Sequence, residues 1–120
     1  MFSDNRSKKV ALVAHCLLNQ NAKVDGYACY KAAVPEFSAL LEEFDYGIFQ
    51  LPCPEMYAAG IRRWWQVSTQ YNCLGFKKDF IFLANFTADQ ITDYLENKFR
   101  LVLIGADGSP SCGVSITDYD

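Results

Sequence analysis

Continuous runs of apolar residues, each followed by polar or turn-forming residues, are the clearest pattern along this chain. Residues 10–14 are all apolar, which is typical of a strand buried on both faces of a parallel sheet. Residues 46–51 predict a second strand, which stops at Pro52 because proline has no N–H to donate to a sheet. Residues 100–105 predict a third strand of the same kind, and the polar residues 19–26 predict a loop.

Helical periodicity predicts the segments between these strands. Apolar residues recur at helical spacing over residues 34–44, and Pro35 suits the first turn of that helix. Thr87 is a typical N-cap residue with Gln90 as its capping partner. We therefore expect a second helix to begin at Thr87 and to run through Lys98.

The alternation of predicted strands and helices defines the expected fold. Residues 56–84 carry the weakest pattern, and we interpret them as mostly helical. No repeat or linker interrupts the order, so the sequence predicts a single α/β domain over residues 1–120. We expect it to be Rossmann-like, with a small parallel sheet flanked by helices. The chain has 120 residues, 51% of them hydrophobic, and such a domain can bury a core without disulfide staples.

Charge and the amino-terminal sequence limit the partners. The formal net charge of -3 argues against a nucleic-acid polymer, because that partner requires clustered lysines and arginines. Residues 1–9 are polar and lead into a strand that is too short for a signal sequence or a membrane span. We therefore expect a cytoplasmic protein without membrane contact. Thiols stay reduced there, so the five cysteines should form no disulfide framework.

Three of the five cysteines follow predicted strands in segments rich in proline, glycine and serine. They are Cys16, Cys53 and Cys112. Because the carboxyl ends of parallel strands meet at one edge of a sheet, where α/β folds bind their ligands, we expect the three thiols to gather there. Cys29 and Cys73 have aromatic or aliphatic neighbours, and we interpret them as small core residues.

The residues alone leave the nature of this cysteine site open. Zinc is one candidate, although no local C-x₂₋₄-C pair is present. His15 would be a fourth ligand, but neighbouring residues in a strand point to opposite faces, which opposes a shared ion with Cys16. The same geometry opposes a hydrolase with Cys16 as nucleophile and His15 as base. An iron-sulfur cluster held by three thiolates is the other candidate.

Four short motifs occur in order along most of the chain. They are Cys16-Leu17-Leu18, Asp25-Gly26, Cys53-Pro54-Glu55 and Ser109-Pro110-Ser111-Cys112-Gly113. In this combination the chain resembles the thiouracil desulfidase (TudS-like) family. The resemblance implies a cytoplasmic Rossmann-like domain in which Cys16, Cys53 and Cys112 hold a 4Fe-4S cluster.

The resemblance also implies an activity and two further site residues. The expected enzyme is a desulfidase that cleaves a C–S bond with water and releases sulfide from a small thiolated compound such as thiouracil. Glu55 and Ser109 match the proton-handling residues of the family, and this chemistry needs an acid or base. From the residues alone, two other roles stay open: a solvated loop carboxylate or N-cap partner for Glu55, and a turn hydroxyl for Ser109.

The substrate pocket and the class of function have alternatives as well. A thiolated nucleobase could stack on Trp64 or Tyr57. The other class of function is a non-catalytic iron-sulfur or sulfide-binding module, which would keep the cysteines without turnover.

Overall fold

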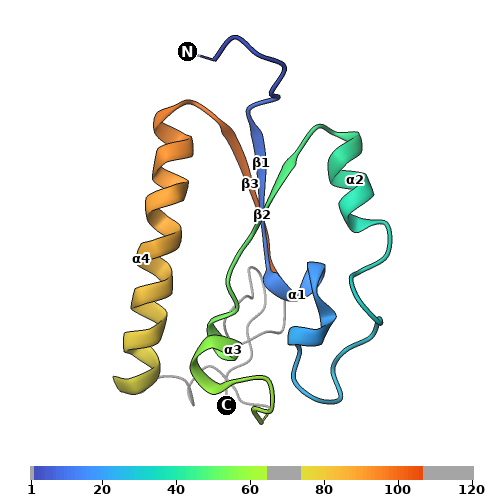
Figure 1. Cartoon of the computed structure of the whole chain (residues 1–120), viewed down its shortest axis with the longest axis vertical. Helices are drawn as coiled ribbons and strands as arrows, with labels where there is room; N and C mark the ends of the chain where they lie inside the picture. Colours follow the sequence, from blue (N-terminus) through green and yellow to red (C-terminus); the bar gives the residue numbers. More distant parts are fainter. Residues whose placement is uncertain (1, 65–73, 107–120) are drawn as a thin grey trace.

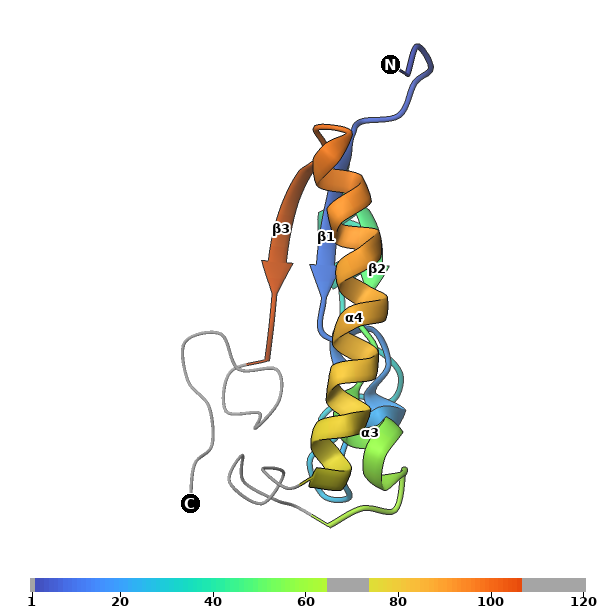
Figure 2. The ribbon, with the colours of Figure 1, turned by 90° about the vertical axis from the view of Figure 1, so that its left-hand side faces the viewer.

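The fold is built on a parallel sheet of three strands. The computed structural model describes residues 2–64 and 74–106. Its strands are β1 (Lys9–Val13), β2 (Gly47–Gln50) and β3 (Arg100–Ile104), in the spatial order β2-β1-β3. β1 is therefore the central strand of the described sheet, and Figure 2 shows its carboxyl end pointing the same way as that of β3.

Helices flank this sheet on both faces. Their bounds are α1 (His15–Leu18), the 3-10 helix η1 (Gln20–Ala22), α2 (Phe37–Glu43), α3 (Pro54–Ala59) and α4 (Leu74–Glu96). Figure 1 shows α4 on one side of the sheet and α2 on the other, with α1 and α3 beyond the carboxyl ends of β1 and β2. The prediction of an α/β fold with a small parallel sheet and flanking helices is confirmed. The assignment of residues 1–120 to one domain stays a prediction.

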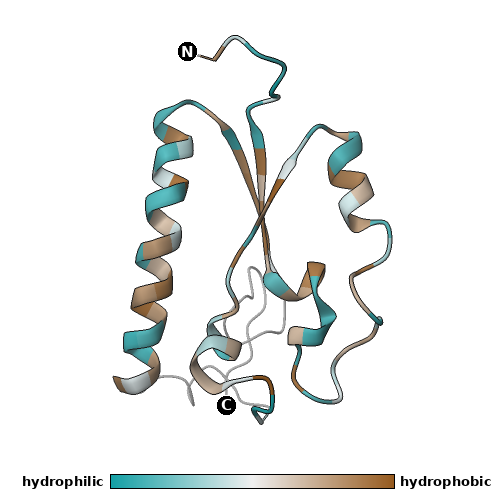
Figure 3. Ribbon diagram, viewed as in Figure 1, coloured by the Kyte–Doolittle hydropathy of each residue, from teal (hydrophilic) through white to brown (hydrophobic). Residues whose placement is uncertain are grey.

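The core lies on the face of the sheet that α2 covers. Ala11 and Val13 in β1 have no exposed surface, and they cluster with the buried Leu41 of α2. Val102 and Ile104 of β3 pack against the same cluster, because the parallel register places them beside Ala11 and Val13. Figure 3 shows apolar residues along these strands and also on the helices that flank them.

The opposite face of the sheet packs against α4. Leu12 and its register partner Phe49 lie on this face, and the Phe49 ring meets Tyr94 of α4 in an edge-to-face contact with centroids 6.5 Å apart. Leu83 is the buried residue of α4. Packing on both faces explains why β1 is continuously apolar rather than alternating. The expectation that β3 is equally buried is wrong, because β2 and β3 lie at the edges of the described sheet and are partly exposed.

Two helix starts differ from the sequence prediction. Thr87 is not an N-cap, because α4 runs without a break from residue 74 to residue 96. Aromatic residues extend the helix toward its amino end, where Phe76 and Phe80, one turn apart, stack with centroids 6.2 Å apart. Pro35 lies before α2 rather than in its first turn, because Glu36 adopts a left-handed conformation with φ 62° and serves as the N-cap.

Among the helices in residues 2–64 and 74–106, none combines the length and the apolar character that crossing a membrane requires.

Neighbouring leucines of α2 give a test of the core. Leu41 is 8% exposed, whereas Leu40 is 51% exposed. We expect Leu41→Ala to lower the free energy of unfolding by about 2–5 kcal/mol, because it removes packed methyl groups and leaves a cavity. Leu40→Ala, the matched control, should change it by less than about 1 kcal/mol. Urea unfolding followed by circular dichroism measures both, and equal losses would contradict the assigned core.

Candidate functional site

Two of the motif cysteines lie close to the same edge of the sheet. Cys16 is in α1, immediately after β1, and Cys53 follows β2, the neighbouring strand. Backbone and side-chain hydrogen bonds join the two segments. Leu51 N donates to Val13 O at 2.8 Å, and Gln50 Nε2 donates to His15 O at 3.0 Å. The structure thus places the first two cysteine segments side by side at the carboxyl edge.

The third strand, β3, also ends at this edge of the sheet. Ala14 N donates to Ile104 O at 2.8 Å, so β3 ends level with the start of the Cys16 segment. Cys112 and Ser109 lie beyond residue 106, outside the described residues, as does Cys73. Their places in the site therefore remain predictions. Within residues 2–64 and 74–106, no three histidine, cysteine or acidic side chains gather as a metal site would require.

Cys53 is held by the amino end of α3. It is the N-cap residue of this helix, and its Sγ accepts a hydrogen bond from Met56 N at 3.4 Å. The flanking Pro54 stands in the first helical turn, where its missing N–H costs nothing. Burial raises the pKa of the Cys53 thiol, while the Met56 N–H and the Arg63 charge act in the opposite direction. A free Cys53 is therefore mainly a thiol, and a bound cation would favour its thiolate.

A buried acid and a buried base lie near Cys53. Glu55, in the first turn of α3, and Arg63 are each 7% exposed. Both influence the pKa of the Cys53 thiol: Arg63 lowers it and Glu55 raises it. The interpretation of Glu55 as a solvated loop carboxylate is therefore wrong, because Glu55 is buried and helical. Its place beside Cys53 suits the expected role in proton transfer, which stays a prediction.

Gly60 directs Arg63 back into the protein. It ends α3 with φ 85°, a left-handed conformation that glycine adopts without strain. The turn that follows is closed by Arg63 N, which donates to Gly60 O at 3.3 Å. Arg62 remains exposed, whereas Arg63 is buried. The burial of Arg63 could not be predicted from the sequence, because two adjacent arginines do not reveal which one a turn will bury.

Gln20 is a second site residue that the sequence analysis missed. It is 3% exposed, and both ends of its amide are used: Nε2 donates to Cys16 O at 2.8 Å, and Oε1 accepts from Cys29 N at 3.0 Å. Gln20 therefore fixes the backbone at Cys16 against the loop that contains Cys29. Cys29 itself is exposed, so its interpretation as a core residue is wrong.

His15 takes part in the site through the backbone. Its Nδ1 lies 3.1 Å from Leu51 O, a distance for a hydrogen bond that ties α1 to the end of β2. His15 and Cys16 lie in a short helix rather than in a strand, so the expected alternation of strand side chains does not apply to them. The contact with Leu51 identifies His15 as a residue that joins two segments.

The aromatic residues proposed for stacking differ in their surroundings. Tyr57 stacks on Phe82 of α4, with centroids 6.0 Å apart and an angle of 17° between the rings. Trp64 is 84% exposed. Tyr57 thus packs α3 against α4, and Trp64 is the more accessible of the two rings.

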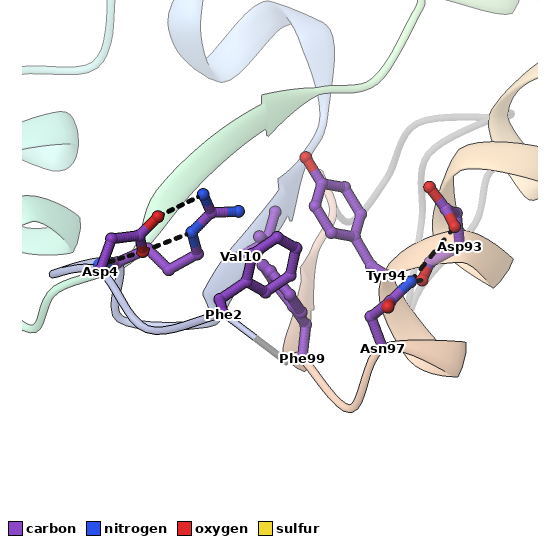
Figure 4. Close-up of a pocket in the computed structure, with 8 residues that line it drawn as sticks. Phe2, Asp4, Val10, Asp93, Tyr94, Asn97 and Phe99 are labelled. Atoms are coloured by element: carbon purple, nitrogen blue, oxygen red, sulfur yellow. Dashed lines mark hydrogen bonds and ion pairs between the residues drawn. The ribbon is translucent and has the colours of Figure 1, made fainter.

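An open hollow of about 510 Å³ lies at the opposite edge of the sheet, near the start of β1 and the end of α4. Figure 4 shows the residues that line it, namely Phe2, Asp4, Arg6, Val10, Asp93, Tyr94, Asn97 and Phe99. Two of its charged groups satisfy each other, because Arg6 pairs with Asp4 at 2.6 Å and lies 3.7 Å from the centroid of the Phe2 ring. Asp93 accepts a hydrogen bond from Asn97 Nδ2 at 3.3 Å. It contains no cysteine and is separate from the cysteine site.

Two of the three expected cluster ligands lie at the carboxyl edge. Cys16 and Cys53 are free thiols on adjacent segments, and Cys53 accepts a backbone hydrogen bond, a feature that tunes cluster thiolates. Glu55 and Arg63 place a buried carboxyl group and a buried guanidinium near Cys53. This donor set suits an iron-sulfur cluster once a third thiolate joins it, and the cluster itself stays a prediction.

Gln20 provides a test of the site's framework. Gln20→Leu should lower the free energy of unfolding by about 1–3 kcal/mol, because it leaves Cys16 O and Cys29 N without their partner. Asn21→Ala is the matched control: Asn21 is exposed, and its change should stay within about 0.5 kcal/mol. Chemical unfolding of the metal-free protein measures both. An unchanged Gln20→Leu variant would show that this amide does not hold the loop.

Comparison with known proteins gives the family of the chain. Residues 8–120 match the family described as "Putative 2-thiouracil desulfurase". A protein of Methanocaldococcus jannaschii named "Uncharacterized protein MJ0003" is 30% identical over 109 residues, which cover 91% of this chain and 70% of that protein. No solved structure matches the chain. The chain therefore belongs to the 2-thiouracil desulfurase family.

Proposed function

We propose that this protein is a desulfidase that removes sulfur from a small thiolated compound such as 2-thiouracil and releases it as sulfide. Membership in the 2-thiouracil desulfurase family supports the reaction class. The observation that carries the proposal is the pairing of the Cys16 and Cys53 segments at the carboxyl edge, next to the buried Glu55.

The proposed cofactor is a 4Fe-4S cluster held by Cys16, Cys53 and Cys112. When bound, a cluster with three thiolate ligands supplies an iron with an open position for a sulfur atom. The chain contributes the ligand geometry: β1 and β2 set the spacing of the first two segments, and Gln20 and His15 fix their backbones. The Met56 N–H stabilises the sulfur of Cys53 in its charged form.

The reaction balances without a net oxidant or reductant. Water supplies the oxygen that replaces sulfur on carbon, the C–S bond breaks, and the protons of water leave with the sulfide. A positioned acid or base must move these protons, and the buried Glu55 is our candidate for that step. Ser109 is the second proposed proton-handling residue.

The direct test is anaerobic purification followed by assays of iron, labile sulfide and sulfide release from 2-thiouracil and 4-thiouracil. Cys53→Ser and Cys112→Ser should lose most of the iron and the activity, because each removes a ligand. Cys29→Ser should keep both, because Cys29 is exposed and outside the ligand set. Zinc in place of iron would refute the cofactor. A cluster-replete protein that never releases sulfide would favour the non-catalytic module.

Glu55 separates catalysis from cluster binding. Glu55→Gln should keep the cluster absorption but slow sulfide release by about 10² or more, the usual worth of a positioned acid or base. Ser109→Ala should have a milder effect, since water can replace a hydroxyl in part. Glu43→Gln, a change of an exposed carboxylate on α2, is the control and should leave the rate unchanged. Full activity in Glu55→Gln would remove the proposed role.

A further inference from the structure

Arg63 is a buried cation, and no carboxylate among the described residues forms an ion pair with it. Arg63 is 7% exposed. The ion pair found in the described part of the chain joins Arg6 and Asp4 and does not involve Arg63. Burying a guanidinium is unfavourable unless an anion or hydrogen bonds compensate for the lost water. The contacts of Arg63 should therefore show what compensates its charge.

Only the terminal nitrogens of Arg63 are hydrogen-bonded. Nη2 donates to Ala22 O at 2.7 Å, and Nη1 donates to Gly60 O at 3.2 Å. Both acceptors are neutral backbone carbonyls, so they orient the guanidinium but do not neutralise it. Nε is buried and has no acceptor, so it is the guanidinium nitrogen that makes no hydrogen bond at all. A buried donor without a partner costs about 1–3 kcal/mol, and its presence calls for a missing acceptor.

The two carbonyls place Arg63 between the cysteine segments. Ala22 ends η1, which follows the helix that contains Cys16, and Gly60 ends α3, which begins after Cys53. The positive charge of Arg63 lowers the pKa of the Cys53 thiol against the effect of burial. The guanidinium is thus electrostatically part of the cysteine site and not of a distant surface.

The unused donor indicates the kind of ligand that Arg63 can receive. Nε is the nitrogen with no acceptor at all, and Nη1 and Nη2 each use one of their two N–H groups. A directed Nε–H and a positive charge are therefore on offer to an anion. Among small anions, the proposed function supplies sulfur atoms that carry a negative charge.

We propose that Arg63 is an anion-binding residue whose Nε–H receives the charged sulfur of a small ligand bound beside Cys53. The inference rests on the proposed function, which supplies two such sulfur anions: the hydrosulfide that is released and the deprotonated thiolated substrate. Arg63 then compensates the negative charge on the sulfur of the ligand, and the ligand gives Nε its missing hydrogen-bond acceptor. This role is distinct from the proton transfer assigned to Glu55.

Calorimetric titration under anaerobic conditions tests the proposal without turnover. Sodium hydrosulfide and 2-thiouracil are titrated in separate arms, at a mildly alkaline pH, into the wild type and into Arg63→Met. We expect Arg63→Met to weaken binding about tenfold to hundredfold in at least one arm, the worth of a hydrogen bond to a charged group. The arm that responds identifies the sulfur anion as product or substrate. Arg62→Met, a change of the exposed neighbour, should leave both dissociation constants unchanged.

Further measurements separate this role from folding and from catalysis. If Arg63→Met does not fold, Arg63→Lys replaces it, and bromide soaked into crystals of the wild type should give an anomalous peak within hydrogen-bonding distance of Arg63 Nε. Equal binding by the wild type and the Arg63 variants, or bromide only at other residues, would overturn the proposal. If hydrosulfide binding depends on Arg63 but no sulfide is released from substrate, the desulfidase proposal is wrong and this inference stands. If sulfide is released but binding does not depend on Arg63, the desulfidase proposal stands and this inference is wrong.

Discussion

The parallel pairing of β1 with strands on both sides is the constraint on which the site depends. β1 binds β2 and β3 along its length, and the last hydrogen bonds of these ladders reach Val13 and Ala14. The three strands consequently end at one level, as their segments leave the sheet toward the same edge. Parallel pairing also requires a crossover between each pair of strands, which places α2 and α4 on the sheet and keeps them away from its carboxyl edge.

The site combines a rigid backbone with unusual electrostatics. Gln20 and His15 fix the segments through hydrogen bonds to backbone atoms. The charges are instead concentrated around Cys53, where Glu55 and Arg63 are both withdrawn from water. Interactions between charges are stronger in such surroundings than at the surface. The binding energy of a charged ligand at this site would therefore depend strongly on the sign and position of each group.

The fold was largely predictable, because each strand belongs to a short apolar run that local sequence reveals, even though only β1 is buried throughout. Helix boundaries were less predictable. Thr87 is a typical N-cap residue, yet α4 begins well before it and packs there against α3 through the Tyr57–Phe82 contact. For the site, the sequence predicted that the cysteines follow the strands, and the Cys16 and Cys53 segments do lie side by side. The roles of Gln20 and Arg63 could not be predicted, since a polar residue becomes part of a site only when tertiary structure buries it.

The position of β3 in the sheet has a consequence for how the protein folds. Its partner β1 stands near the other end of the chain, with β2 and both crossover segments between them. Closing so long a loop costs more entropy than pairing β1 with β2, and contacts of high sequence separation form slowly. We therefore expect the β1-β2 unit to be available early on the ribosome, whereas the shared edge arises only once translation has passed β3. Assembly of the site therefore waits for the synthesis of β3 and cannot accompany that of β1 and β2.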